Sequence, residues 1–472
     1  MVTVPPDWYQ RQVQSPGREG VQLELLLSVS RERAGTLRGQ VEQGLRTAVR
    51  DGSLRAGAVL PSTRDLAAQL GVSRKIVVDA YAQLAAEGYL TMRQGARPRV
   101  ASGALRPVAE GAGPPSTPSL RFDFRPSRPD VSAFPREAWA RCLREAVGEI
   151  NTEDLGYGDP LGVPALRVAL ADHLGRTRGV VASPGLTVVT NGYLHGLGSI
   201  CHALRARGAR TIAIEHPGNP EQTAIAARAG LTPVRAPVDE LGLRVADLPG
   251  DVDAVVVTPA HQHPTGVVLA PSRRAELIAL LRSRGALAIE DDYDAEYRYD
   301  RPAVGALQGL DPEHVVYCGT TSKVLAPALR LGWLVAPPAL TAALRALPEL
   351  GSARVEQLAF ARFVERGDLD RHLRRMRLRY RRRRDAMVAA LAASLPSAEL
   401  HGIAAGLHVT VALPGVVDEP ALLRVARMRG IGLATLADYG HTSGRPTLIL
   451  GYSQMTEARI TAGVAELATL VG

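Results

Sequence analysis

The sequence predicts an α/β protein in which a small helical module with a β-hairpin precedes a large domain with a mainly parallel sheet. Three observations support this prediction. Beyond residue 120, short β-branched runs alternate with longer helical patterns, which is typical of a parallel sheet covered by helices. Before residue 101 the apolar spacing is helical. The stretch between them is rich in Pro and Gly and has no sustained apolar period, which indicates a linker.

The chain of 472 residues is too long for one ordinary core, so we divide it into three parts. A front domain occupies residues 21–100, a linker 101–120 and a large domain 121–472. Apolar residues make up 46% of the chain and charged residues 22%, a balance that excludes wholesale disorder. The formal charge of +9 favours a polyanionic partner.

Cysteine spacing and apolar runs bear on the compartment. The three cysteines, Cys142, Cys201 and Cys318, show neither metal-ligand nor secreted-scaffold spacing, so we expect a reducing environment and no metal. The first residues lack a basic-then-apolar signal segment. Polar residues and glycines interrupt the uncharged stretch at 185–204, which argues against a membrane span. We therefore expect a soluble, cytoplasmic protein.

The front domain has the spacing of a helix-turn-helix. Apolar residues at 36–51 fall on one helical face, and residues 61–90 then predict a short helix, a tight turn and a longer helix. Ser62 with Asp65 resembles a capping box for the short helix, and Ser73 is placed to cap the longer one. The predicted inner faces are Leu66 and Leu70 in the short helix, and Val77, Ala80, Tyr81 and Leu84 in the longer one.

This geometry predicts DNA binding. The N-terminal turn of the second helix enters the major groove, which brings Ser73, Arg74 and Lys75 within reach of phosphates or base edges. Residues 89–100 alternate like a hairpin with Gly95 at its tip, and form a basic wing for the DNA backbone or minor groove. The alternative is a protein-interaction domain with a solvated basic face. The agreement of turn, caps and basic residues favours DNA.

Five apolar runs of the large domain each end at a polar cluster. They are LTVVT at 186–190, TIAIE at 211–215, AVVVT at 254–258, LAIE at 287–290 and VVYC at 315–318. In open α/β sheets, ligands collect outside the carboxyl ends of parallel strands. We therefore expect these clusters to face one crevice. A single cluster would be an ordinary loop, whereas five in succession indicate a binding site.

The residues at these ends fit pyridoxal 5′-phosphate (PLP). Two of the 56 basic residues are lysines, Lys75 and Lys323, and lysine can form an imine with a carbonyl cofactor, whereas arginine cannot. Lys323 stands at a strand end beside hydroxyls. Hydroxyls, a guanidinium and the amides that open a helix are suited to hold the phosphate. These groups belong to Thr320, Ser322, Arg330, Gly192, Tyr193 and Leu194.

PLP also needs an acid at its pyridine nitrogen and a donor at its phenolic oxygen. Asp291, directly after the strand LAIE, can keep the nitrogen protonated so that the ring withdraws electrons. Tyr293 can donate a hydrogen bond to the phenolate. Asp292 remains an alternative to Asp291, because the sequence does not resolve a shift of one residue.

The front domain resembles the winged helix of the GntR regulators. The resemblance is carried by STRDLA at 62–67, GVSR at 71–74 and EGYL at 87–90. The DNA contacts that it implies are Arg64, Ser73, Arg74 and Gly95. The wing departs from the usual Gly-x-Gly-Thr tip, because ARP follows Gly95 here.

The large domain resembles the aminotransferase-type domain of fold type I pyridoxal enzymes. The motifs are TPAHQHPTG at 258–266, EDDYDAEYRYDRP at 290–302, GTTSKVLAPALRLGW at 319–333 and RHLRRMRLRYRRRR at 371–384. More narrowly, the order of winged helix, linker and these motifs resembles the MocR subfamily of GntR regulators. The resemblance implies an N-terminal winged helix-turn-helix, a PLP-dependent transferase fold type I domain with a mainly parallel sheet, and a homodimer with its cofactor sites at the interface.

Carried onto this sequence, the resemblance implies that Lys323 forms the internal aldimine, while Asp291 meets the pyridine nitrogen and Tyr293 the phenolic oxygen. His263 occupies the place before Pro-Thr-Gly where true aminotransferases carry Asn. Tyr157 in GYGDPLG is expected to reach the phosphate of the neighbouring subunit.

Three further positions bear on the ligand. Arg445 is a candidate clamp for the carboxylate of an amino-acid effector. Asn219 stands where many relatives carry the aromatic that contacts the cofactor ring, and His195 where Gln is common. Backbone amides would survive both changes, whereas the identity of the effector would not carry over.

Two functions of different classes follow. The first is a transcriptional regulator that senses PLP, or the aldimine of PLP with an amino compound, and binds a double-stranded DNA operator; its aminotransferase-like domain is not expected to turn over substrate physiologically. The second is a genuine aminotransferase with an accessory DNA-binding module. A DNA-binding protein with a cofactor-free domain is disfavoured, because Lys323 and its companions are present.

The segment 371–384 holds nine arginines in fourteen residues. Met376 and Tyr380 fall at helical spacing within it, and the resemblance places it on a long helix. We favour a solvated or partner-paired helix face over a second nucleic-acid surface.

Overall fold

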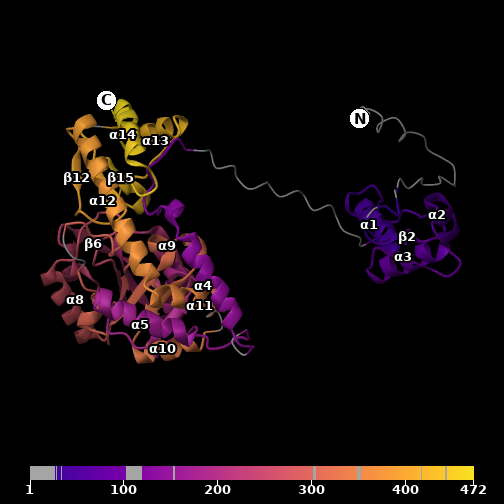
Figure 1. Ribbon diagram of the computed structural model, residues 1–472, viewed down its shortest axis with the longest axis horizontal. Coiled ribbons are helices and arrows are strands. Elements are labelled where there is room, and N and C mark those ends of the chain that lie inside the picture. The colour runs from indigo at the N-terminus through magenta and orange to yellow at the C-terminus, as the bar shows by residue number, and fades with distance from the viewer. Residues whose placement is uncertain are drawn as a thin grey trace. The chain divides into compact units, whose positions relative to one another are not determined.

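The computed structural model describes residues 27, 29–32, 34–102, 120–152, 155–300, 304–347, 351, 353–415, 417–441 and 444–471. The chain forms two compact units, Met1–Thr117 and Pro118–Gly472 (Figure 1). Of the linker predicted at 101–120, residues 103–119 lie outside the described residues. The three-part division of the chain therefore stays a prediction.

The described part of the first unit consists of three helices and a two-stranded sheet (Figure 1). Its elements are α1 (Leu37–Arg50), α2 (Thr63–Leu70), α3 (Arg74–Ala86), β1 (Leu90–Thr91) and β2 (Arg99–Val100). The strands pair antiparallel, with Leu90 opposite Val100, as expected for the hairpin. Val77, Ala80, Tyr81 and Leu84 of α3 are buried against Val41 and Leu45 of α1. The predicted inner face is therefore confirmed.

The turn between α2 and α3 follows from local interactions. Ser62 Oγ accepts from the amide of Asp65 at 3.2 Å, which satisfies a donor that α2 itself leaves unpaired. The Asp65 carboxylate accepts from the Ser62 hydroxyl rather than from its amide, so the reciprocal capping box is not formed in this described segment. Gly71 ends α2 with φ of 63°, a left-handed conformation that favours glycine. Ser73 occupies the N-cap position of α3, but its side chain makes no capping hydrogen bond.

The second unit is built on an eight-stranded sheet. In spatial order its strands are β4 (Thr187–Thr190), β11 (Gly332–Val335), β10 (Val315–Thr320), β9 (Leu287–Asp291), β8 (Ala254–Val257), β5 (Thr211–His216), β6 (Thr232–Asp239) and β7 (Gly242–Leu243). Neighbours from β10 through β6 run parallel, whereas β11 and β7 pair antiparallel. The five strands expected from apolar runs are β4, β5, β8, β9 and β10, so the mainly parallel sheet is confirmed.

Helices cover both faces of this sheet (Figure 1). The helices of the described part of this unit are α4 (Arg136–Glu149), α5 (Pro164–Arg178), α6 (Tyr193–Ala206), α7 (Pro220–Arg228), α8 (Pro271–Arg284), α9 (Thr321–Val324), α10 (Pro338–Arg345), α11 (Arg354–Glu365), α12 (Asp368–Ser394), α13 (Glu419–Met428) and α14 (Glu457–Val471). Of these, α13 and α14 pack beside two small sheets rather than on the large sheet. Successive strand residues point to opposite faces. Val188 packs in the core with α6 and α10, whereas Val189 packs in the core with α5 and α11. No described helix is both long and apolar enough to cross a membrane.

Two small sheets accompany α13 and α14. One has the strand order β12 (Glu399–His401), β13 (His408–Ala412) and β15 (Thr447–Gly451), and the other pairs β3 (Phe122–Asp123) with β14 (Ile431–Gly432). β3 and β14 pair in parallel, so residues near 122 join a sheet formed more than 300 residues later in the chain. This pairing places the segment directly after β3 beside residues that come from the last part of the chain, near β14.

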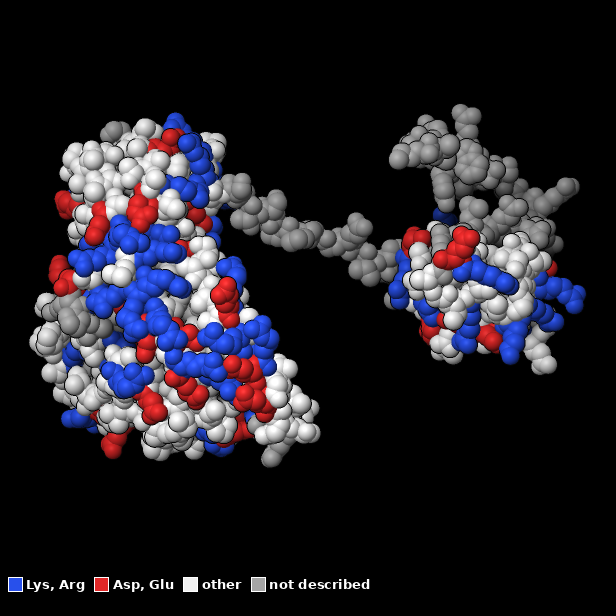
Figure 2. All heavy atoms as spheres, viewed as in Figure 1, with Lys and Arg blue, Asp and Glu red and all other residues white. Residues whose placement is uncertain are grey.

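The arginine-rich segment lies on the long helix α12, where Met376 and Tyr380 are buried. Figure 2 shows arginines gathered over the face on which α12 lies in Figure 1. Several of them are paired: Arg379 and Arg383 contact Asp130 at 3.1 and 2.9 Å. These ion pairs agree with the partner-paired helix face.

A buried ion pair joins α5 to the segment after β9. Arg178 Nε donates to Asp292 Oδ2 at 2.8 Å, and the two side chains are 2% and 1% exposed. Tyr317 of β10 donates to the same oxygen at 2.7 Å. Because an unpaired charge at this depth costs several kcal/mol, the pair holds the end of β9 against α5.

We predict that Arg178→Met lowers the free energy of unfolding by about 3–5 kcal/mol, because the buried Asp292 carboxylate loses its cation. Chemical denaturation measures this loss. As a control, Arg345→Met removes the cation of a more exposed pair with Asp159, 2.9 Å apart, and should cost at most about 1 kcal/mol. Equal losses in the two variants would contradict a special role for the buried pair.

Candidate functional site

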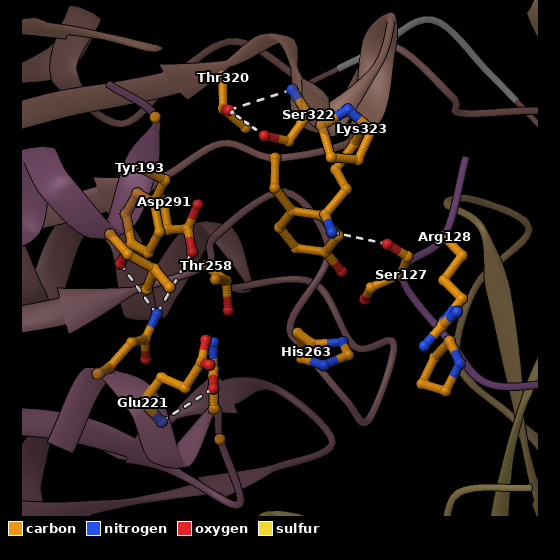
Figure 3. A pocket seen from close by; sticks show the side chains of 18 of the residues that line it. Ser127, Arg128, Tyr193, Glu221, Thr258, His263, Asp291, Thr320, Ser322 and Lys323 are labelled. Carbon is orange, nitrogen blue, oxygen red and sulfur yellow. Dashed lines mark hydrogen bonds between the residues drawn. The ribbon is translucent and has the colours of Figure 1, made fainter. Parts of the chain in front are cut away.

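The carboxyl ends of β4, β5, β8, β9 and β10 meet at one cavity of about 590 Å³. Each of the five predicted polar clusters contributes lining residues, as the strand-end argument expects. From these clusters come Gly192, Tyr193, Leu194, Glu215, Gly218, Asn219, Thr258, His263, Asp291, Tyr293, Thr320, Ser322 and Lys323. The volume lies in the range of small-molecule sites. Figure 3 shows the labelled side chains grouped around Lys323.

Lys323 points into this cavity from the short helix α9 (Figure 3). Its Nζ donates to the carbonyl oxygen of Ser127 at 2.6 Å. Burial lowers the pKa of this amine, while the carboxylates of Asp291 and Asp294 act in the opposite direction. A lowered pKa raises the fraction of neutral amine, which is the nucleophilic form.

Backbone strain is concentrated at this cavity. Among the described residues, two that are not glycine have positive φ, Ser127 at 61° and Arg330 at 50°, and both line the cavity. This conformation is unfavourable for residues with a side chain and persists where the surroundings impose it, often at ligand sites.

One end of the cavity offers groups for a phosphate. Thr320 Oγ1 accepts from the Ser322 amide at 3.1 Å and donates to its hydroxyl at 3.0 Å. Arg330 lines the same cavity; its backbone amide donates to the Pro327 carbonyl at 3.3 Å, while its guanidinium makes no hydrogen bond or ion pair to any other described residue. Gly192 is the N-cap of α6, and the first amides of a helix lack partners within the helix. The structure thus brings the predicted phosphate-binding residues together.

The structure separates the two adjacent aspartates. Asp291 lines the cavity and accepts a hydrogen bond from Gln222 Nε2 at 3.3 Å, whereas Asp292 points to Arg178 and Tyr317. Burial, with the nearby Asp292 charge, raises the pKa of Asp291 well above its usual range. A cation bound opposite Asp291 would favour its charged form and relieve this cost.

Tyr293 belongs to a buried network. Its hydroxyl lies 3.1 Å from His261 Nδ1, and that nitrogen lies 3.0 Å from Asp294 Oδ2. His261 was not predicted, although it belongs to the same HQHPTG motif as His263. Burial lowers the pKa of His263 to about 3, so this ring is neutral where it faces the cavity.

Two predicted residues lie elsewhere. Tyr157 is fully exposed and lines a separate hollow near Arg354. Arg445 contacts Glu399 at 2.6 Å and lines another hollow beside α13. The structure therefore does not bring Arg445 to Lys323, because Arg445 lies just before β15, a strand of the small sheet. Its predicted role as effector clamp has no support from this placement.

The two departures from the family pattern have different consequences. His195 does not line the cavity; its Nδ1 accepts from the Asn191 amide at 3.2 Å. Asn219 does line it and accepts from the Glu221 amide at 3.0 Å.

Several lining residues were not predicted. Glu215 and Thr258 end the runs TIAIE and AVVVT, so the strand-end signal was available for them; Glu215 accepts from the Thr258 amide at 3.1 Å, and burial raises its pKa to about 7. Ser127 and Arg128 follow β3 rather than a strand of the large sheet. Because they come to the cavity only through the pairing of β3 with β14, no local signal could reveal them.

The predicted DNA-contacting residues all lie on the surface of the first unit. Arg64, Ser73, Arg74, Lys75 and Gly95 are exposed. Ser73 and Arg74 stand at the start of α3, and Gly95 lies between β1 and β2 with φ of 78°. The arrangement gives a helix N-terminus and a basic hairpin, both open to a partner.

The cavity residues fit PLP. Lys323 provides an amine with a lowered pKa, and Asp291 provides a buried carboxyl that a cationic ligand would stabilise. Hydroxyls, an arginine and the first amides of α6 provide groups suited to a phosphate.

Comparisons with known proteins agree with both units. Residues 37–100 match the model of the bacterial regulatory proteins of the gntR family, and residues 131–427 that of aminotransferase class I and II. The chain is 33% identical over 442 residues to the HTH-type pyridoxine biosynthesis transcriptional regulator PdxR of Corynebacterium glutamicum, covering 92% of this chain and 95% of that protein.

Two further proteins are similar. A probable rhizopine catabolism regulatory protein, MocR of Rhizobium meliloti, is 31% identical over 473 residues, covering 94% of this chain and 95% of that one. The crystal structure of Pyrococcus horikoshii kynurenine aminotransferase with PMP superposes with a TM-score of 0.68 at 25% identity, covering 75% of this chain and 91% of that chain. The chain therefore belongs to the MocR type of GntR-family regulators, which join a GntR helix-turn-helix to an aminotransferase class I and II domain.

Proposed function

We propose that this chain is a PLP-dependent transcriptional regulator that binds operator DNA through its first unit and PLP through its second. One observation carries the proposal: five strand ends converge on Lys323, with Asp291 and a phosphate end in the same cavity, in a chain that also has a GntR-type unit. The regulatory relatives support the same function, since they match nearly the whole chain.

The residues of the cavity divide the work of holding PLP. Lys323 provides the amine, and the Ser127 carbonyl orients it. Asp291 would meet the pyridine nitrogen, Tyr293 and the neutral His263 would face the phenolic oxygen, and the phosphate would be held by Thr320, Ser322, Arg330 and the amides of Gly192, Tyr193 and Leu194, all of which line the cavity. Bound there, the cofactor supplies an aldehyde that condenses with amines and a ring that withdraws electrons.

On the DNA side, α3 would enter the major groove with Ser73, Arg74 and Lys75, while Arg64 and the wing tip at Gly95 contact the backbone. We infer that the protein acts as a homodimer, with Tyr157 reaching the partner's site, which agrees with its full exposure. PLP, or PLP joined to an amino compound, would be the signal. This ligand can regulate DNA binding only if it binds two arrangements of the dimer with different affinity.

The second candidate is an aminotransferase with an accessory DNA-binding unit. The observation that favours it is the presence of Lys323 and Asp291 in an aminotransferase fold. Footprinting upstream of neighbouring genes, with and without PLP, tests the regulator. Steady turnover of an amino acid with a keto acid, together with a footprint that ignores PLP, would favour the enzyme.

We predict that PLP followed by borohydride reduction adds a phosphopyridoxyl group to the peptide containing Lys323, because this amine is buried near the Asp291 carboxyl and has a lowered pKa. Peptide mass spectrometry measures the label. Lys323→Ala should remove it. The matched control is Lys75→Ala, which removes the other lysine of the chain and should keep the label. A label that survives Lys323→Ala at full level would refute the assignment.

We predict that Arg74→Ala weakens operator binding by about 1–3 kcal/mol if Arg74 contacts a base. If Arg74 instead binds the DNA backbone, the slope of log affinity against log salt concentration should fall by the amount expected for about one phosphate contact. A fluorescence titration over a salt series separates the two. Arg46→Ala is the control, because Arg46 pairs at 2.7 Å with Glu87 at the opposite end of α3. Unchanged affinity of Arg74→Ala at every salt concentration would show that Arg74 does not contact DNA.

A further inference from the structure

A second cation of the cavity has no part in holding the cofactor as described above. Arg128 lines the cavity together with Arg330. Figure 3 shows Arg128 on the other side of Lys323 from Thr320 and Ser322, with Ser127 between Lys323 and Arg128. The charge of Arg128 contributes to lowering the pKa of Lys323, so the two cationic groups are close enough to interact. Two arginines, Arg128 and Arg330, thus line the same cavity.

The Arg128 guanidinium is largely available for a ligand. Its ionic contact within the described part of the chain is to Asp123 at 3.6 Å. The same carboxylate accepts two shorter bonds from Arg125, at 2.7 and 2.8 Å, so Asp123 is already paired. No hydrogen bond from the guanidinium to another described residue is present, and the side chain is 45% exposed.

The backbone that carries Arg128 is held on both sides. The carbonyl of Ser127, which has φ of 61°, accepts from Lys323 Nζ at 2.6 Å. The carbonyl of Arg128 accepts from the Ser453 hydroxyl, and the Asp130 amide donates to the Tyr380 hydroxyl at 2.9 Å. This segment, which includes the strained Ser127, holds Arg128 in the lining of the cavity near the Lys323 amine, and backbone strain of this kind is common at ligand sites.

We infer that Arg128 binds the anionic group of an effector that is a primary amine bearing a carboxylate. The inference rests on the proposed function and names the class of its signal. With the cofactor held by Lys323 as an imine, the effector amine would replace the lysine: a carbon–nitrogen bond to the effector forms, the bond to Lys323 breaks, and the two hydrogens of the incoming NH2 group pass to the lysine nitrogen, which leaves as a free amine. The carboxylate then meets the guanidinium fork, which matches its two oxygens.

Neighbouring groups agree with this assignment. His263 is neutral because its pKa is lowered to about 3, so it offers no competing charge to the carboxylate. Arg330 lines the cavity and is assigned to the phosphate in the proposed function. Arg445 is paired with Glu399 in another hollow. Among the described residues that line the cavity, Arg128 is therefore the arginine left for a second anion.

The test titrates PLP-loaded full-length protein with glycine, β-alanine and γ-aminobutyrate, and with methylamine, ethylamine and propylamine as counterparts that lack the carboxylate. The cofactor absorbance reports binding without requiring turnover. The variants are Arg128→Met and Arg128→Lys. The control is Arg136→Met, which removes an exposed arginine of the same segment outside the cavity. Melting curves check that each variant is folded.

Wild type should prefer at least one of the amino acids over its alkylamine. Arg128→Met should weaken the binding of that amino acid by about tenfold or more, while the affinity for the alkylamine changes little and PLP stays bound. Arg128→Lys should bind the amino acid with intermediate affinity, and Arg136→Met should bind it like wild type. Loss of PLP by Arg128→Met would overturn the inference, because Arg128 would then serve the cofactor. The inference would also be overturned if wild type bound the amino acids no better than the alkylamines, or if Arg128→Met lost the same affinity for both kinds of probe. Failure of wild type to bind PLP would instead refute the proposed function.

Discussion

The site depends on one constraint: parallel strands of an open sheet end at the same edge. Strands β10, β9, β8 and β5 are parallel neighbours, so the segments that follow them meet without any need for sequence proximity. Lys323 and Asp291, more than 30 residues apart, thereby line one cavity. Strand β11 lies between β10 and β4 and is antiparallel to both, so β4 runs in the same direction as β10. Gly192 and the start of α6, which follow β4, therefore lie at the same edge.

Burial then gives these side chains their chemistry. The pKa of the Lys323 amine is lowered and that of the Asp291 carboxyl is raised, both chiefly by burial, so each group would be stabilised by a partner that the protein itself does not supply. By contrast, Asp292 has its partners within the fold, in Arg178 and Tyr317. Two adjacent carboxylates therefore serve ligand binding and stability separately, because successive residues at a strand end point to opposite faces of the sheet.

Much of the fold and of the site was predictable. The five strands, the helix-turn-helix and the hairpin depend on local periodicity and turn chemistry, which read directly from the residues. The capping box at Ser62 and the cap at Ser73 were less successful, because side-chain rotamers decide whether such a bond forms. Lys323, Asp291 and Tyr293 were predicted because they stand at or just after strand ends, and His263 because of the family motif, whereas Ser127 reaches Lys323 only through a tertiary contact.

The sequence by itself determined the order of the two units, the strands of the sheet and the kinds of group at their ends, because each depends on residues close together in the chain. The tertiary structure alone decided which aspartate faces the cavity, that Arg445 lies away from Lys323, and that Arg128 lies beside it. These outcomes depend on pairings between distant segments, above all β3 with β14. No local pattern encodes such a pairing, since it is stabilised by the packing of the whole unit.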